Sequence, residues 1–202
     1  MKKVTHPVTM FLKAGFILVT FVFATLCSAQ TGVPKRTLLA LSKNNHTLNI
    51  VDPATLKVLA SMPVGSDPHE VIASADGKTA YVTIYGGGSL HEINVLDLTT
   101  GKPLTTIDTR PLYGPHGITF ANGKVWFTAE GSKAVGCYNP ATGKVDWSMG
   151  TGQDRTHMVY VTPDAKTIYT TNINSGTVSI LTSTTVQPRQ PAPPGAMPHE
   201  EW

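Results

Sequence analysis

The stretch GPHGITFANGKVWFT, residues 114–128, decides the fold. It contains a Pro-His pair, a short apolar run at residues 118–120, an Asn-Gly pair at 122 and 123, and a second apolar run at 125–127. Two β-rich runs joined by Asn-Gly are a strong short-range signal for a β-hairpin. The sequence therefore predicts an antiparallel hairpin here, with a histidine just inside its first strand.

The same cassette recurs along the chain. PHEVIASADGKTAYVT begins at Pro68 and THMVYVTPDAKTIYTT at Thr156, and a second kind of turn recurs as DPATLKV from Asp52, DLTTGKP from Asp97 and NPATGKV from Asn139. The histidines that lead the cassettes are spaced 47, 41 and 42 residues apart; they are His69, His116, His157 and His199. A period of 41 to 47 residues with about four short strands in each repeat is typical of the blades of a β-propeller.

The phase of the repeats predicts how many blades there are. We expect an all-β fold, a partial β-propeller of about three and a half four-stranded antiparallel blades over residues 37–183. The chain should begin on the second strand of one blade, pass through two complete blades and form three strands of another. Residues 184–202 should be a Pro-rich tail that leads into a truncated next blade. Half a ring leaves open blade faces, so we expect either a homodimer that completes a ring or poor solubility.

The first 29 residues have the pattern of a secretory signal peptide. Three lysines lie within the first 13 residues, an apolar run covers residues 16–26, and small residues precede Gln30. We expect a signal-peptide helix at 1–29, cleavage after Ala29, a linker at 30–36, and a periplasmic or extracellular protein with no membrane span after cleavage. Lipidation at Cys27 is the weaker alternative, because Leu26 is bulky where a small residue is expected.

The net charge argues against one class of partner, and the cysteine count excludes an intramolecular disulfide in the mature chain. The chain has 16 Lys and Arg against 13 Asp and Glu, and the excess of three lies in the signal segment. The mature chain is therefore formally neutral, which argues against nucleic-acid binding. Cys137 is the one cysteine left after cleavage, so an intramolecular disulfide cannot form. Its place in a predicted third strand indicates a small core-facing residue.

The repeats resemble the YVTN-type β-propeller family. The resemblance rests on YVT at positions 81–83, YTTN at 169–172, the turns SADGK and TPDAK, and VGSDPHEV at 64–71. The middle repeat, PHGITFANGKVWFTAEG, also resembles blades of streptogramin lyase-like and gluconolactonase-like propellers. The resemblance implies that the chain is like the N-terminal half of a seven-bladed propeller. Because such blades support many different activities, the resemblance says little about the function of this protein.

Placing the repeats on a propeller gathers the leading histidines at the mouth of the central channel. The candidate ligand-binding residues there are His69, His116, His157, His199, Glu130, Arg155, Tyr113 and Asn172. Converging neutral imidazoles with a carboxylate could hold a divalent transition metal. Alternatively, Pro-His is a structural feature of the blade, or the histidines contact a ligand without a metal. No HExxH or CxxC motif is present to favour the metal.

These features favour a non-catalytic exported scaffold that binds a small ligand or a protein at the channel mouth. No G-x-S-x-G motif indicates a serine hydrolase, and we assign no catalytic residue. The resemblance of the middle repeat implies an alternative, a metal-dependent lyase or lactonase that uses His116, His157 and Glu130. A further alternative is half of a haem d1-like redox propeller, although the chain has no C-x-x-C-H motif.

Overall fold

The computed structural model describes residues 36–184. The predicted signal peptide, nearly all of the linker, His199 and all but the first residue of the Pro-rich tail lie outside the described residues. Within residues 36–184, fourteen β-strands and one short 3₁₀ turn, η1 (Gly86–Gly88), make up the regular structure. No helix in this part of the chain is long and apolar enough to cross a membrane.

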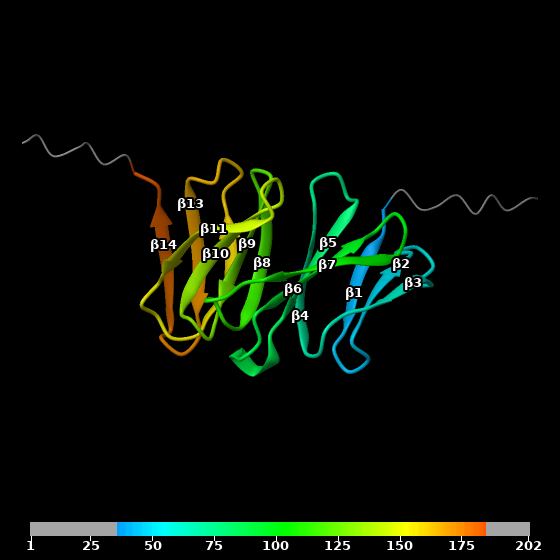
Figure 1. The fold of residues 1–202 in the computed structure, drawn as a ribbon, viewed down its shortest axis with the longest axis horizontal. Helices are drawn as coiled ribbons and strands as arrows, with labels where there is room; N and C mark the ends of the chain where they lie inside the picture. Colours follow the sequence, from blue (N-terminus) through cyan, green and yellow to red (C-terminus); the bar gives the residue numbers. More distant parts are fainter. Residues whose placement is uncertain (1–35, 185–202) are drawn as a thin grey trace, which may run out of the picture. The chain divides into compact units, whose positions relative to one another are not determined.

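The strands form four antiparallel sheets, each a meander of consecutive strands (Figure 1). Blade 1 contains β1 (Leu38–Ser42), β2 (Thr47–Val51) and β3 (Val58–Pro63). Blade 2 contains β4 (Pro68–Ala73), β5 (Thr79–Ile84), β6 (Glu92–Asp97) and β7 (Lys102–Asp108). Blade 3 contains β8 (Pro115–Ala121), β9 (Lys124–Ala129), β10 (Ala134–Asn139) and β11 (Lys144–Gly150). Blade 4 contains β12 (Thr156–Val161), β13 (Thr167–Asn172) and β14 (Thr177–Thr182).

This arrangement confirms the predicted fold class, an all-β partial propeller. Sheets of three, four, four and three strands amount to three and a half four-stranded blades. The turn at Asp52 joins β2 to β3 just as the turn at Asp97 joins β6 to β7, so blade 1 corresponds to strands two to four of a full blade. Blade 4 contains strands one to three.

Asx turns explain why the third and fourth strands connect where they do. The side-chain oxygens of Asp52, Asp97 and Asn139 accept hydrogen bonds from backbone N–H groups two residues further on, at 2.7–3.0 Å. Such side-chain bonds imitate a backbone turn and hold the chain reversal in place. At Asp97, bonds from the Thr99 hydroxyl and N–H lower the pKa of the carboxyl to about 2.

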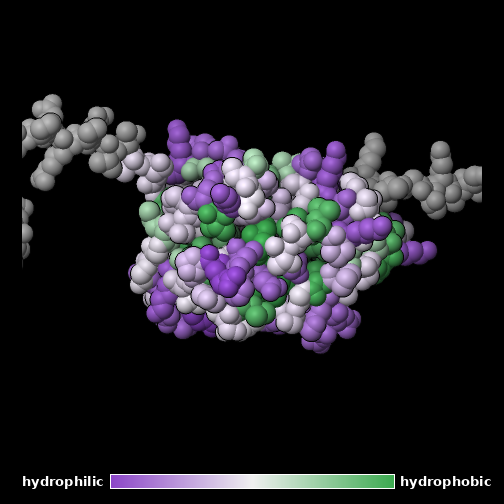
Figure 2. All heavy atoms as spheres, viewed as in Figure 1, coloured by the Kyte–Doolittle hydropathy of each residue, from purple (hydrophilic) through white to green (hydrophobic). Residues whose placement is uncertain are grey.

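The apolar core lies between neighbouring blades and not inside any one of them. One cluster joins blades 1 and 2 around Leu48 and Val82, a second joins blades 2 and 3 around Ile93 and Phe127, and a third joins blades 3 and 4. Cys137 belongs to the third cluster, where burial raises the pKa of its thiol to about 12. In Figure 2 apolar side chains come to the surface in the middle of the view, with polar side chains above and below.

Candidate functional site

The first strands of blades 2, 3 and 4 share a β-bulge at the histidine. In each, the register shifts so that two residues oppose a single threonine on the next strand. The bulged pairs are His69-Glu70, His116-Gly117 and His157-Met158, and the opposing threonines are Thr83, Thr128 and Thr171. A bulge interrupts the alternation of side chains and re-aims the residues within it. The repeated bulge therefore gives the three histidines a common orientation.

Two of the opposing threonines, Thr83 and Thr128, link their own blade to the next one. The Thr128 hydroxyl accepts a hydrogen bond from the Gly117 N–H (2.8 Å) and donates one to the carbonyl oxygen of His157 in blade 4 (2.5 Å). The Thr83 hydroxyl likewise donates to the carbonyl oxygen of His116 in blade 3 (2.8 Å). The position of each of these histidines is thus fixed by the preceding blade as well as by its own.

The three imidazoles form a row across the inner strands. His69 Nδ1 lies 2.7 Å from His116 Nε2, and the ring centroids of His116 and His157 are 3.9 Å apart. Gly117 makes the second approach possible. A Cβ atom at this position would lie 2.5 Å from the His157 carbonyl oxygen, closer than real Cβ contacts allow. The absence of a side chain at Gly117 therefore brings blade 4 close enough for the rings to meet.

The residue that follows the second strand of each blade contacts the histidine of the next blade. Lys43 Nζ lies 2.7 Å from His69 Nε2, the Tyr85 ring packs edge-on against His116 with centroids 5.1 Å apart, and Glu130 Oε1 lies 2.7 Å from His157 Nδ1. One backbone bond holds each of Tyr85 and Glu130 beside the inner strands, since its N–H donates to the carbonyl oxygen of the residue just before the first strand of its own blade. A cation, an aromatic ring and an anion thus occupy equivalent positions along the row.

Glu130 is the buried anion of the site. Its carboxylate accepts hydrogen bonds from the Tyr85 hydroxyl and from His157 Nδ1, and Arg155 Nε lies 3.4 Å from Oε1. Burial alone would raise the pKa of this carboxyl, but the Tyr85 and His157 bonds and the Arg155 charge hold it below its usual range. Burial and the bond to Glu130 raise the pKa of the Tyr85 hydroxyl. At neutral pH the pair is therefore a carboxylate with a neutral phenol.

His116 is the buried neutral base of the site. It is 5% exposed, and burial, together with the neighbouring His157 and His69, lowers its pKa to about 4. Its Nδ1 atom has no hydrogen-bond partner among residues 36–184. His116 Nε2 is paired with His69 Nδ1 at 2.7 Å, so Nδ1 is the ring nitrogen of His116 that is left for another contact.

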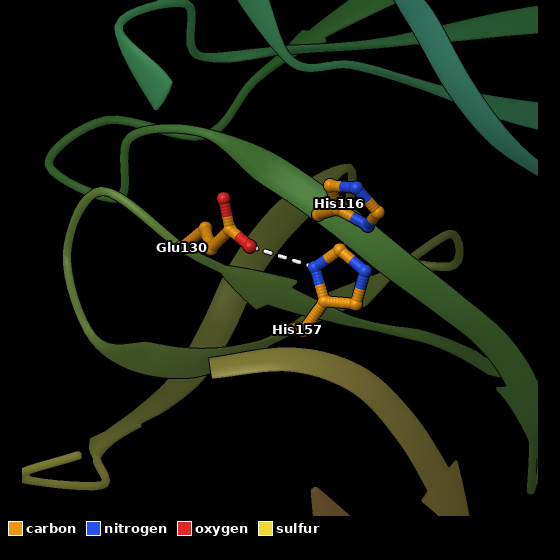
Figure 3. Close-up of side chains that lie close together, drawn as sticks. All are labelled: His116, Glu130 and His157. Carbon is orange, nitrogen blue, oxygen red and sulfur yellow. Dashed lines mark hydrogen bonds and ion pairs between the residues drawn. The ribbon is translucent and has the colours of Figure 1, made fainter. Parts of the chain in front are cut away.

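His116, Glu130 and His157 form a group of side chains that could hold a metal ion. One ligand atom from each falls within 4.8 Å of the other two, and the three side chains converge from β8, from the loop after β9 and from β12 (Figure 3). A tetrahedral ion with bonds of about 2.1 Å holds its ligands about 3.4 Å apart. Side-chain shifts of roughly 1 Å would bring the set to that spacing.

The structure brings together five of the eight residues expected at the site, namely His69, His116, His157, Glu130 and Arg155. Tyr113 instead packs edge-on against His91, with centroids 5.6 Å apart. The Asn172 amide donates to Thr177 and Ser179 within blade 4. His199 lies outside the described residues.

Tyr85 and Lys43 also touch the histidines, and sequence reasoning did not place them among the site residues. Asp67, whose Oδ1 lies 3.2 Å from His69 Nε2, is in a loop that the repeats did place at the channel mouth, although not among the candidate ligand-binding residues. A signal for Tyr85 and Lys43 was present in the sequence. Tyr85 and Lys43 each follow the second strand of a blade, the position that Glu130 occupies in blade 3. Aligning the repeats at this position would have found them.

Comparison with known proteins supports the fold and goes no further. No family model matches the chain, and no curated protein matches it. Among solved structures it is similar to Kuenenia stuttgartiensis hydrazine synthase, with a TM-score of 0.60 and 20% identity over 72% of this chain and 46% of that one. It is also similar to a protein of unknown function from Desulfotomaculum acetoxidans DSM 771, with a TM-score of 0.60 and 18% identity over 74% and 49%. The chain thus spans about half the length of these structures, and likeness at this identity shows the fold alone.

Proposed function

We propose that this protein is an exported YVTN-type propeller scaffold that binds a divalent transition metal through His116, His157 and Glu130. The observation that carries the proposal is the Nδ1 atom of His116, buried and without a partner among the described residues, beside a second imidazole and a carboxylate. A buried polar atom without a partner costs about 1–3 kcal/mol. A metal ion would satisfy this atom and neutralise the buried charge of Glu130.

The donor set selects the class of metal. Two imidazole nitrogens with one carboxylate oxygen suit Zn²⁺, Co²⁺ or Ni²⁺, whereas Ca²⁺ and Mg²⁺ prefer sites made of oxygen ligands. Because burial keeps His116 neutral, the ligand needs no deprotonation at pH 7. Around such an ion, three protein ligands leave a fourth position for water or for a small ligand.

Binding is favoured over metal-dependent lyase or lactonase chemistry by the state of Glu130. Its carboxylate already accepts bonds from Tyr85 and His157, and its pKa is held below the usual range. A general base works best with a pKa near the working pH, so this carboxylate is a poor one. Its part in the proposal is that of a ligand. Export is proposed from the sequence of residues 1–29 alone.

Calorimetric titration of the chelator-treated full chain with Zn²⁺ tests the proposal. We expect one ion per chain in the wild type and at least 100-fold weaker binding in His116→Ala, while His91→Ala keeps wild-type affinity. His91 is a matched control because it is a partly buried histidine that pairs with Asp108 outside the cluster. Circular dichroism of each variant shows whether the sheets remain folded. Equal affinity in His116→Ala and wild type, or no saturable binding to the folded wild type, would refute the metal site.

A further inference from the structure

Each blade turns the same three positions toward the blade that follows it. The pairings Tyr81↔Val95, Trp126↔Cys137 and Tyr169↔Ile180 are equivalent, as are Thr83↔Ile93, Thr128↔Val135 and Thr171↔Val178. The outward apolar side chains are therefore Tyr81, Ile93 and Val95 in blade 2, Trp126, Val135 and Cys137 in blade 3, and Tyr169, Val178 and Ile180 in blade 4. We call the last three the blade 4 face.

Exposure separates the blade 4 face from its equivalents. The six residues in blades 2 and 3 are between 0% and 8% exposed, because the next blade packs on them. Tyr169, Val178 and Ile180 are 38%, 62% and 63% exposed. Tyr160, next to Tyr169 with ring centroids 6.1 Å apart, is exposed on the same sheet. A contiguous apolar patch of this kind is a mark of an interaction surface.

We infer that the blade 4 face binds blade 1 of a second copy of this chain, head to tail. On the side of blade 1 that faces away from blade 2, Leu38 is 50% exposed, although its equivalent in blade 2, Ala80, is fully buried in the cluster that joins blades 1 and 2. One copy therefore contributes the blade 4 face, and its partner contributes the face of blade 1 that points away from blade 2. Two copies supply eight sheets, a number at which propellers close.

Sedimentation velocity of the full chain over a range of concentrations tests this inference, which does not rest on the metal site. We expect a dimer whose dissociation constant rises at least 100-fold in the double variant Val178→Lys/Ile180→Lys. Leu104→Lys should leave the dimer unchanged. Leu104 is a matched control, since it is a similarly exposed apolar residue on β7, away from both faces. A folded monomer at every concentration, or equal effects of the double variant and the control, would overturn the inference.

Cross-linking identifies the surface on the partner. A mixture of Leu38→Cys chains and Val178→Cys chains should form a disulfide-linked heterodimer under mild oxidation. Cys137 is buried and should not interfere. Val178→Cys chains that cross-link to each other instead would show a face-to-face dimer and contradict the head-to-tail arrangement.

Discussion

Replacing Thr128 with valine keeps the shape of the side chain and removes the hydroxyl that joins blades 3 and 4. This hydroxyl is fully buried and lies 2.8 Å from the Gly117 nitrogen and 2.5 Å from the His157 carbonyl oxygen. Thr128→Val leaves both groups without a partner, and each buried polar group so left costs about 1–3 kcal/mol. With partial relaxation we expect a loss of about 2–4 kcal/mol in the free energy of unfolding. For a urea m-value of roughly 2 kcal/mol/M, the unfolding midpoint falls by roughly 1–2 M.

The chain contains its own control for this measurement. Thr171 holds the same position opposite a bulge, but its hydroxyl makes only the 3.2 Å bond with the Met158 N–H and faces no following blade within the described residues. Thr171→Val should cost below about 1 kcal/mol. Both variants are compared by urea unfolding without metal, in the Val178→Lys/Ile180→Lys background so that no second copy covers Thr171. Equal midpoint shifts in the two variants would refute the inter-blade role of the threonine.

Two further predictions concern the close approach of the blades and the Asx turns. Gly117→Ala places a Cβ atom 2.5 Å from the His157 carbonyl oxygen, so it should cost about 1–3 kcal/mol in urea unfolding and weaken Zn²⁺ binding at least tenfold. Gly150→Ala, which meets nothing within 4 Å, should change neither, and a neutral Gly117→Ala would contradict the packing argument. The pKa of Asp97, lowered to about 2 by Thr99, means that its ionised form stabilises the fold above the unfolded value near 4 and that this contribution is lost as pH falls toward 2. Asp97→Asn should therefore lose less stability than the wild type between pH 4 and 2, whereas equal slopes would show that the turn contributes nothing to acid lability.

The fold could be predicted from the sequence because its signals are local. Asn-Gly and Asp-Gly hairpins and the Asx turns each act over a few residues, and their spacing fixed the number of strands per repeat. The phase also followed, since the turn at Asp52, of the same type as the turn at Asp97, comes after the second described strand and not after the third. An exposed apolar face could also be expected, because the repeats predict fewer blades than a closed ring contains. The residues that form this face, and their equivalence to those of blades 2 and 3, could be identified only from the strand pairings.

The candidate site could be predicted only in part, because much of it depends on contacts between blades. The repeated Pro-His pair identified His69 and His116 as candidate site residues, because a repeated motif can be recognised in the sequence alone. The contact of Tyr85 with His116 depends on how blade 3 packs against blade 2, which no local pattern encodes. Tyr113 and Asn172 were expected at the site from their positions in the repeats alone. In the structure the Tyr113 ring packs against His91 and the Asn172 amide donates to Thr177.

The bulge explains why one feature serves both the fold and the site. In a regular strand the histidine would alternate with its neighbours and turn onto an apolar face between blades. The bulge re-aims it, and the threonine of the preceding blade then binds its carbonyl oxygen. The backbone of the site is therefore constant from blade to blade, while the residue after each second strand varies from Lys43 to Tyr85 to Glu130. Substitution at these three positions can therefore change the charge around each imidazole without breaking a ladder bond, and the carboxylate at this position in blade 3 lies beside His157 of blade 4.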